Sequence, residues 1–181
     1  VSVVRPLRAL GANAQALAEI WRFTASDVLI HALPLFHIHG LFVATNVVMA
    51  KGASMKLLNA FSPDRVLESF PEATVMMGVP TFYTRLLQHK KLDRSIVAHM
   101  RLFISGSAPL LAETHREWSE KTGHEIVERY GMTETGIISS CAYDGPRIPG
   151  TVGFALPDTA IRITADGVEV PPDEIGMIEV K

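Results

Sequence analysis

Hydrophobic and polar positions over the first 140 residues follow two alternating periods. Short apolar runs of the kind that form buried strands lie at 28–32, 54–58, 74–79, 101–105 and 125–130. Between them are longer segments in which apolar residues recur every three or four positions or continue unbroken, which predicts helices at 12–23, 40–49, 62–70, 80–88 and 110–121. Alternating strands and helices predict an α/β fold, a mainly parallel sheet with flanking helices.

Local signals support two of the predicted helix ends. Ser62, Pro63 and Asp64 place an N-capping hydroxyl, a proline and an acidic residue in the order typical of a helix start. Gly123 follows the last amphipathic helix, and a glycine there favours a left-handed C-terminal cap.

The pattern changes after Cys141, where prolines and glycines become frequent and only short alternating stretches remain. The dipeptide at 166–167, Asp-Gly, is typical of a hairpin turn, and 175–181 alternates as a half-buried strand does. We therefore expect an incomplete central α/β subdomain at 1–143 and the beginning of a small antiparallel β-rich subdomain at 144–181. An initial Val and a strand at the very end favour a fragment of a longer protein over a complete small domain.

Composition excludes several classes of protein. The chain has 181 residues, of which 48% are hydrophobic and 20% charged, which are ordinary globular values. A net charge of −2 gives no electrostatic case for nucleic acid or an anionic membrane as a partner. One cysteine excludes a disulfide framework and a zinc site built on several thiolates, and no apolar run approaches the roughly 20 residues of a membrane span. We expect a cytoplasmic protein.

Candidate chemistry lies where the predicted strands end, because open α/β sheets bind ligands at the carboxyl ends of their strands. Glycine and hydroxyl residues gather at four such ends: 33–40, 78–81, 105–109 and 130–135. Backbone N–H groups in these turns could meet an anion. Turns between strands and helices use the same residues for structural reasons, and each turn alone favours that interpretation.

The last turn is more specific. A hydroxyl and a carboxylate stand side by side at Thr133 and Glu134, which suits a phosphate contact beside a Mg²⁺ ligand. The structural alternative is a helix N-terminus that Thr133 caps and Glu134 stabilises. His37 and His39 could share one face and bind zinc, but no third ligand with metal spacing is evident. The motifs of serine hydrolases, dinucleotide-binding folds and Walker phosphate loops do not occur.

Together these turns resemble the adenylate-forming acyl-CoA synthetases. The matching motifs, in order, are LPLFHIHG at 33–40, GVPT at 78–81, SGSAPL at 105–110 and YGMTET at 130–135. Later segments at 150–157 and 176–181 also look like this family, so that the resemblance covers about residues 15–181 and includes part of its large N-terminal domain. Within the family, the stretches most similar to malonyl-CoA synthetases are 21–24, 77–87 and 106–117.

The resemblance implies a nucleotide site. Tyr130 would stack on adenine, Thr133 would contact the α-phosphate, and Glu134 would hold Mg²⁺. The remaining cofactor-binding residues implied in this way are Ser107, Ala108, Pro109, Glu128, Arg129 and Gly131.

It also implies an acyl site. His37 would sit between the acyl pocket and the access route of the thiol, and Ile38, Ser107 and Met132 would line that pocket. Arg85 lies one helical turn past position 81, where its guanidinium could bind the second carboxylate of a diacid; the alternative is a solvated helix residue. Isoleucine at 38 replaces an expected threonine, which leaves the identity of the diacid open.

The implied function is an acid–thiol ligase that activates malonate or a close dicarboxylate with ATP and Mg²⁺ and transfers it to CoA. Residues 1–10 do not match the phosphate loop of the family, and its catalytic lysine would lie beyond 181, so we expect the chain alone to be inactive. Two alternatives remain: part of a medium- or long-chain fatty acyl-CoA synthetase, or a non-catalytic remnant. A truncated domain would expose apolar surface that a homo-oligomer could cover.

Overall fold

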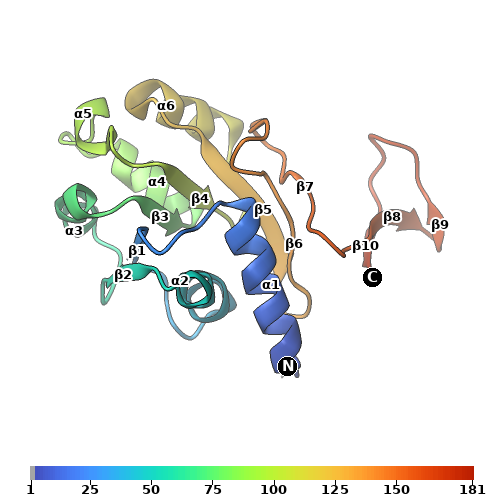
Figure 1. The fold of residues 1–181 in the computed structure, drawn as a ribbon. Coiled ribbons are helices and arrows are strands. Elements are labelled where there is room, and N and C mark those ends of the chain that lie inside the picture. Colours follow the sequence, from blue (N-terminus) through green and yellow to red (C-terminus); the bar gives the residue numbers. More distant parts are fainter. Residues whose placement is uncertain (1–2) are drawn as a thin grey trace.

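The computed structural model describes residues 3–181, which form a seven-stranded sheet and a separate three-stranded sheet (Figure 1). The strands of the large sheet are β1 (Val28–His31), β2 (Ser54–Leu57), β3 (Val75–Gly78), β4 (Leu102–Ser105), β5 (Ile126–Met132), β6 (Gly136–Ser140) and β7 (Phe154–Ala155). Their order is β2-β1-β3-β4-β5-β6-β7. The first five pair in parallel, and β6 and β7 are antiparallel additions. The predicted mainly parallel α/β sheet is confirmed.

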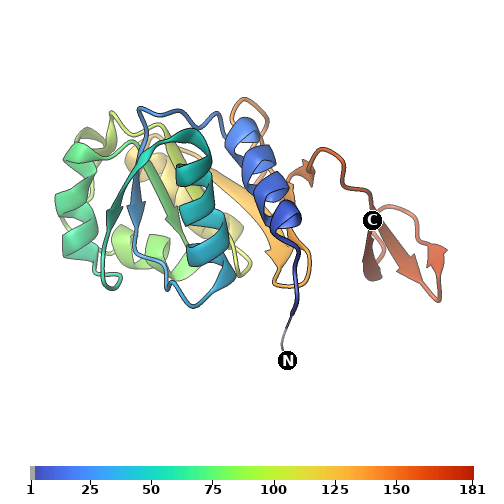
Figure 2. The ribbon, with the colours of Figure 1, turned by 60° about the horizontal axis from the view of Figure 1, so that its bottom comes forward.

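Helices cover both faces of the sheet (Figures 1 and 2). They are α1 (Leu7–Ile20), the π-helix η1 (His39–Ala44), α2 (Thr45–Lys51), α3 (Pro63–Ser69), the 3-10 turn η2 (Phe70–Glu72), α4 (Pro80–Leu87), α5 (Arg94–Val97) and α6 (Ala112–Thr122). Within residues 3–181, no helix combines the length and the apolar character needed to cross a membrane.

Two hydrophobic cores lie on opposite faces of the sheet. Leu17 of α1 and Trp21, which follows this helix, pack with α2 on one face, while Tyr83 of α4 and Trp118 of α6 pack on the other. Strand β3 is buried on both sides: Met77 contributes to the first core, whereas the adjacent residue, Met76, contributes to the second. The continuous apolar runs in the sequence therefore reflect strands without a solvent face.

Several element boundaries differ from the predictions. Helix α1 begins at Leu7, and the single helix expected from residue 40 is a π-helix followed by α2. Ser62 occupies the N-cap position of α3, but its hydroxyl makes no capping hydrogen bond. Gly123 caps α6 with φ of 78°, as expected. Neither α5 nor β6 was predicted.

The small sheet has the order β10-β8-β9 and is antiparallel throughout, with β8 (Ile161–Ala165), β9 (Val168–Glu169) and β10 (Met177–Val180). Asp166 and Gly167 both have positive φ, so the predicted hairpin turn is confirmed. Figures 1 and 2 show this sheet beside the large one. The division at 143/144 stays a prediction; strand pairing itself changes sheets between β7 and β8.

Candidate functional site

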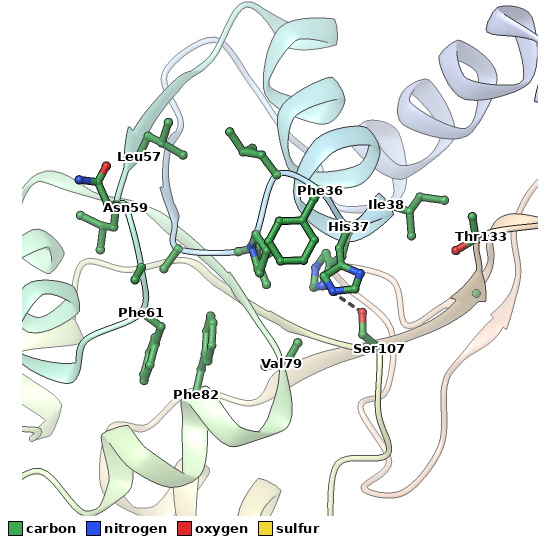
Figure 3. A pocket seen from close by; sticks show the side chains of 18 of the residues that line it. Phe36, His37, Ile38, Leu57, Asn59, Phe61, Val79, Phe82, Ser107 and Thr133 are labelled. Atoms are coloured by element: carbon green, nitrogen blue, oxygen red, sulfur yellow. Dashed lines mark hydrogen bonds between the residues drawn. The ribbon is translucent and has the colours of Figure 1, made fainter. Parts of the chain in front are cut away.

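A cavity of about 1060 Å³ opens where the parallel strands end (Figure 3). Its walls come from the segment after β1 at 32–39, from the last residue of β2 and the segment that follows it at 57–61, and from Val79 after β3. Ser107 after β4 and the end of β5 with its turn, at 131–134, complete them. Turns far apart in the sequence thus converge on one cavity. This is the expected place for a ligand, because parallel sheets bind ligands at the carboxyl ends of their strands.

One end of the cavity is apolar. The rings of Phe61 and Phe82 stack with centroids 3.9 Å apart and 11° between their planes (Figure 3). Outside this stack, Arg85 places its Cζ atom 5.0 Å from the centroid of Phe61 and is exposed to solvent. Arg85 is not among the described residues that line the cavity. Its role as a ligand of a carboxylate therefore stays a prediction, for a carboxylate at the rim of the cavity.

A polar wall consists of His39, Ser107 and, behind them, Arg129. Ser107 Oγ lies 3.2 Å from His39 Nδ1 (Figure 3), and Arg129 Nη2 donates to the same Oγ at 3.4 Å. Because arginine only donates, Ser107 accepts from Arg129 and can donate its own hydrogen to His39 Nδ1. If Ser107 donates in this way, the imidazole hydrogen lies on Nε2; the hydroxyl oxygen has a second lone pair that can instead accept from a protonated Nδ1.

Burial keeps this imidazole neutral. His39 is 3% exposed, and burial, followed by the charges of Arg129 and His31, holds its pKa well below the usual value. Its Nε2 atom is buried and has no hydrogen-bond partner among the described residues. The polar wall therefore contains a ring nitrogen that the folded chain leaves without a hydrogen bond.

Arg129 adds an uncompensated positive charge. Burial lowers its pKa to about 10, so the guanidinium remains cationic at neutral pH. No carboxylate of residues 3–181 forms an ion pair with it, and its Nε atom has no partner there either. A buried, unpaired cation is costly, which makes this place suited to a bound anion.

The loop after β4 is shaped around Arg129. A Cβ atom on Gly106 would lie 2.6 Å from Arg129 Cζ, so a larger residue there would require the guanidinium to move. The next residue, Ser107, has φ of 71°, in the left-handed region that costs a non-glycine residue about 1–2 kcal/mol. The fold thus holds the Ser107 hydroxyl in a strained position between the imidazole and the guanidinium.

The turn with Thr133 and Glu134 joins β5 to β6. The alternative interpretation, a helix N-terminus, is wrong because the chain returns as an antiparallel strand. Both side chains are exposed and line the cavity, next to Met132. Figure 3 shows Ile38 and Thr133 at the opposite end of the cavity from Phe61.

Glu134 fits a Mg²⁺ ion shared with a phosphate, since Mg²⁺ usually takes one or two carboxylates and completes its shell with phosphate oxygens and water. Within the described residues, no group of three or more His, Cys, Asp or Glu side chains could hold a metal. The zinc interpretation of His37 and His39 therefore has no third ligand in this part of the chain.

The implied nucleotide residues are only partly brought together. Ser107, Gly131 and Thr133 line the cavity, whereas the others lie outside its lining: Ala108, Pro109, Glu128, Arg129 and Tyr130. Burial raises the pKa of Glu128, whose Oε1 accepts a hydrogen bond from the backbone of Gly150. Of the implied acyl-site residues, His37, Ile38 and Met132 line the cavity. Their individual roles remain predictions.

The sequence also contained two site residues whose importance was not recognised. The sequence suggests His39 only as a zinc ligand and Arg129 only as one of the implied nucleotide-binding residues. The spacing of His37 and His39 gave no usable signal, because the chain turns into η1 there and His37 is exposed while His39 is buried. Nothing in the sequence indicates that Arg129 is buried without a partner.

Comparison with known proteins identifies the family. The AMP-binding enzyme family matches residues 2–181. Among curated relatives, the mitochondrial malonate–CoA ligase ACSF3 of Mus musculus is 36% identical over 175 residues, which cover 88% of this chain and 30% of the relative. The chain thus spans about a third of such relatives.

Solved structures agree with this assignment. ATP-bound MatB from Rhodopseudomonas palustris has a TM-score of 0.94 at 59% identity, over 96% of this chain and 35% of that protein. A malonyl-CoA ligase ternary product complex with methylmalonyl-CoA and AMP bound has a TM-score of 0.91 at 37% identity, over 99% and 40%. The resemblance predicted from the turn motifs is confirmed: the chain belongs to the AMP-binding enzyme family, with malonate–CoA ligases among its relatives.

Proposed function

We propose that this chain is the central part of the AMP-binding domain of an acid–thiol ligase. The complete ligase would activate malonate, or a close dicarboxylate, with ATP and transfer the acyl group to CoA. Support comes from the family, from relatives named malonate–CoA ligases, and from similar structures that hold ATP or methylmalonyl-CoA with AMP. Since the chain spans about a third of these proteins, we propose that it is inactive alone.

The unpaired charge of Arg129 behind the polar wall is the observation that favours a diacid. A diacid keeps one free carboxylate after the other has reacted, whereas a fatty acid has none. A carboxylate at the polar wall would compensate the Arg129 charge and could accept a hydrogen bond from His39 Nε2. We therefore assign the second carboxylate to this wall, in preference to Arg85 at the rim.

The reaction would take place at the turn with Thr133 and Glu134, which lines the cavity at the end away from Phe61. An oxygen of the reacting carboxylate attacks the α-phosphorus of ATP, and the bond to pyrophosphate breaks. Thr133 would contact the α-phosphate and Glu134 would hold Mg²⁺, which supplies charge neutralisation at the phosphates when it is bound. The CoA thiolate then attacks the acyl carbon and AMP leaves, with His37 between the acyl group and the access route of the thiol.

The test compares two arginines in the complete ligase. Malonate- and butyrate-dependent pyrophosphate release would be measured for the wild type, Arg129→Met and Arg85→Ala. Hydrogen bonds to charged groups are worth about 1.5–3 kcal/mol, so Arg129→Met should lower kcat/KM for malonate by about 10- to 150-fold and leave butyrate unchanged. A malonate-specific loss in Arg85→Ala alone would move the carboxylate to the rim, and no loss in either variant would refute the diacid assignment.

A second candidate is a medium- or long-chain fatty acyl-CoA synthetase. The apolar end of the cavity, with its stacked Phe61 and Phe82, favours this alternative because an alkyl chain could fill it. Octanoate in the same assay separates the two candidates. Activation of octanoate without malonate would support the second, and activation of neither would support a non-catalytic remnant.

A further inference from the structure

The hairpin formed by β5 and β6 carries Thr133 and Glu134, and its outer edge is only partly paired. Strand β7 pairs with β6 at Ser139 and Ser140 alone. Nearer the turn, at Ile137, no strand of the described chain lies on that side.

A side chain of α1 takes the place of a strand at this point. Asn13 Nδ2 donates to the carbonyl of Ile137 at 2.7 Å, and Asn13 Oδ1 accepts from the Ile137 N–H at 3.1 Å. The amide thereby makes both hydrogen bonds that a neighbouring strand would make with one residue. These bonds join positions that are 124 residues apart.

Arg5 makes a second attachment to the hairpin, at Thr135, which lies nearer to the turn than Ile137. Its Nη2 atom donates to the carbonyl of Thr135 at 2.9 Å. Between the two attachments lies Gly136, where an added Cβ would be 2.6 Å from Arg5 Nη1 and 3.0 Å from Asn13 Oδ1. We call Arg5 and Asn13 together the hairpin clamp.

The inner side of the hairpin is equally tight. A Cβ on Gly131 would lie 2.1 Å from the carbonyl oxygen of Gly136, and the register of β5 and β6 shifts at a bulge just below the turn. Neither Thr133 nor Glu134 forms a side-chain hydrogen bond or ion pair within residues 3–181. Their positions therefore depend on where the backbone of the hairpin is held.

We propose that Asn13 and Arg5 are positioning residues, which fix the hairpin so that Thr133 and Glu134 stand at the phosphate and metal position of the cavity. This inference rests on the proposed function for the role of the turn. The attachment itself is independent of that function, so the two can be tested separately.

The first test measures backbone hydrogen exchange in the complete ligase. Asn13→Ala removes the partner of the Ile137 N–H, so exchange at Ile137 should become at least about ten-fold faster while Ser139 and Ser140 change little. Gln15→Ala is the matched control, because Gln15 is an exposed amide on the same helix that bonds only Glu19. Unchanged exchange at Ile137, or a loss of protection throughout the protein, would refute the claim that Asn13 holds the hairpin locally.

The second test measures catalysis. Asn13→Ala should lower kcat for malonate adenylation about ten-fold and raise the Mg²⁺ concentration at half-maximal rate, with the KM for malonate within two-fold of wild type. Arg5→Lys keeps a donor for Thr135 and should recover most of the activity that Arg5→Ala loses. A raised KM for malonate with unchanged kcat would contradict positioning of the turn.

The two tests separate failure of the clamp from failure of the proposed function. A wild-type ligase that activates no acid would refute the proposed function and, with it, the catalytic part of this inference. Fast exchange at Ile137 in Asn13→Ala would then still establish the attachment of the hairpin.

Discussion

Single residues determine how closely backbone segments approach around the cavity. A Cβ on Gly131 would meet the carbonyl oxygen of Gly136, which is backbone and can move only with the whole hairpin. By contrast, Gly11 in α1 has open space around its Cβ position. The two glycines therefore differ in what an alanine would do.

We expect Gly131→Ala to lower the free energy of unfolding by about 2 kcal/mol or more, because the new methyl group overlaps the hairpin. Gly11→Ala should raise it by about 0.5–1 kcal/mol, since alanine is the better helix former and nothing opposes it. Urea denaturation of both variants measures these changes. Equal effects would contradict the close contact at Gly131.

The buried imidazole of His39 predicts a pH dependence. Its pKa in the folded protein lies well below the ordinary 6.5 because of burial and the charges of Arg129 and His31. As pH falls below about 6.5, the unfolded chain takes up a proton that the folded chain does not. The stability contribution is thus complete above pH 6.5 and decreases as pH falls from there towards the lower folded-state pKa.

His39→Gln should accordingly reduce the difference in unfolding free energy between pH 7.5 and pH 5.5. Burial also lowers the pKa of His31 and His124, so part of the pH dependence of the unfolding free energy should remain in the variant. Denaturant titrations of wild type and variant at the two pH values provide the measurement. An identical change in unfolding free energy between the two pH values in both proteins would show that His39 is protonated equally in the folded and unfolded states.

Residues in recognisable motifs could be predicted to line the site, whereas those defined by packing could not. His37, Ile38 and Glu134 stand in contiguous runs and do line the cavity. The contact of Ser107 with His39 and Arg129, and the unpaired charge of Arg129, arise where β4, β5 and the segment after β1 meet, which no local pattern reports.

At the scale of elements, an ion pair ties the beginnings of β1 and β4 together. Arg101 donates from Nε and Nη2 to the two carboxylate oxygens of Asp27, both at 2.6 Å. Burial alone would raise the pKa of Asp27, but hydrogen bonds from Arg101, Thr24 and Thr74 outweigh it and lower that pKa. The pair is bidentate, and the side chain of Asp27 is 3% exposed.

Arg101→Leu should lower the free energy of unfolding by about 3 kcal/mol, because it leaves a buried carboxylate without its cation. Arg22→Leu is the matched control. Arg22 pairs with Asp144, but both side chains are more than half exposed, so its loss should cost less than about 1 kcal/mol. Thermal or urea unfolding compares the two, and similar losses would contradict a structural role for the Asp27 pair.

Strand β6 shows why some elements escape prediction. The sequence GIISS has two apolar residues followed by two serines, which matches neither the period of a strand nor that of a helix. Its conformation depends on pairing with β5 and on the side chain of Asn13 from α1. Helices α4 and α6, in contrast, have clear periodicity and were predicted to within two residues at either end.

For the whole molecule, the alternation of apolar runs was sufficient to predict the parallel sheet. The boundary of the small sheet was harder, because β7 lies among prolines and glycines yet pairs with β6. Leu156, next to β7, is buried in the core that contains Trp21. The large sheet therefore needs residues beyond 143.

A chain that ends at residue 160 should keep the unfolding midpoint of the large sheet within a few degrees, since β8, β9 and β10 pair only with one another. In a chain that ends at 143, the free energy of unfolding should fall by several kcal/mol, because this chain lacks β7 and the buried Leu156. Calorimetry of the two truncations tests this. Equal stability would support the boundary at 143/144.

The central claim is that the cavity activates a dicarboxylate. The most direct measurement is the rate of ATP–pyrophosphate exchange by the complete ligase with malonate and with butyrate, which differ chiefly in the second carboxylate. The account predicts exchange with malonate at a kcat/KM at least about ten-fold above that for butyrate. Equal values, or a preference for butyrate, would contradict a carboxylate site beside His39, Ser107 and Arg129.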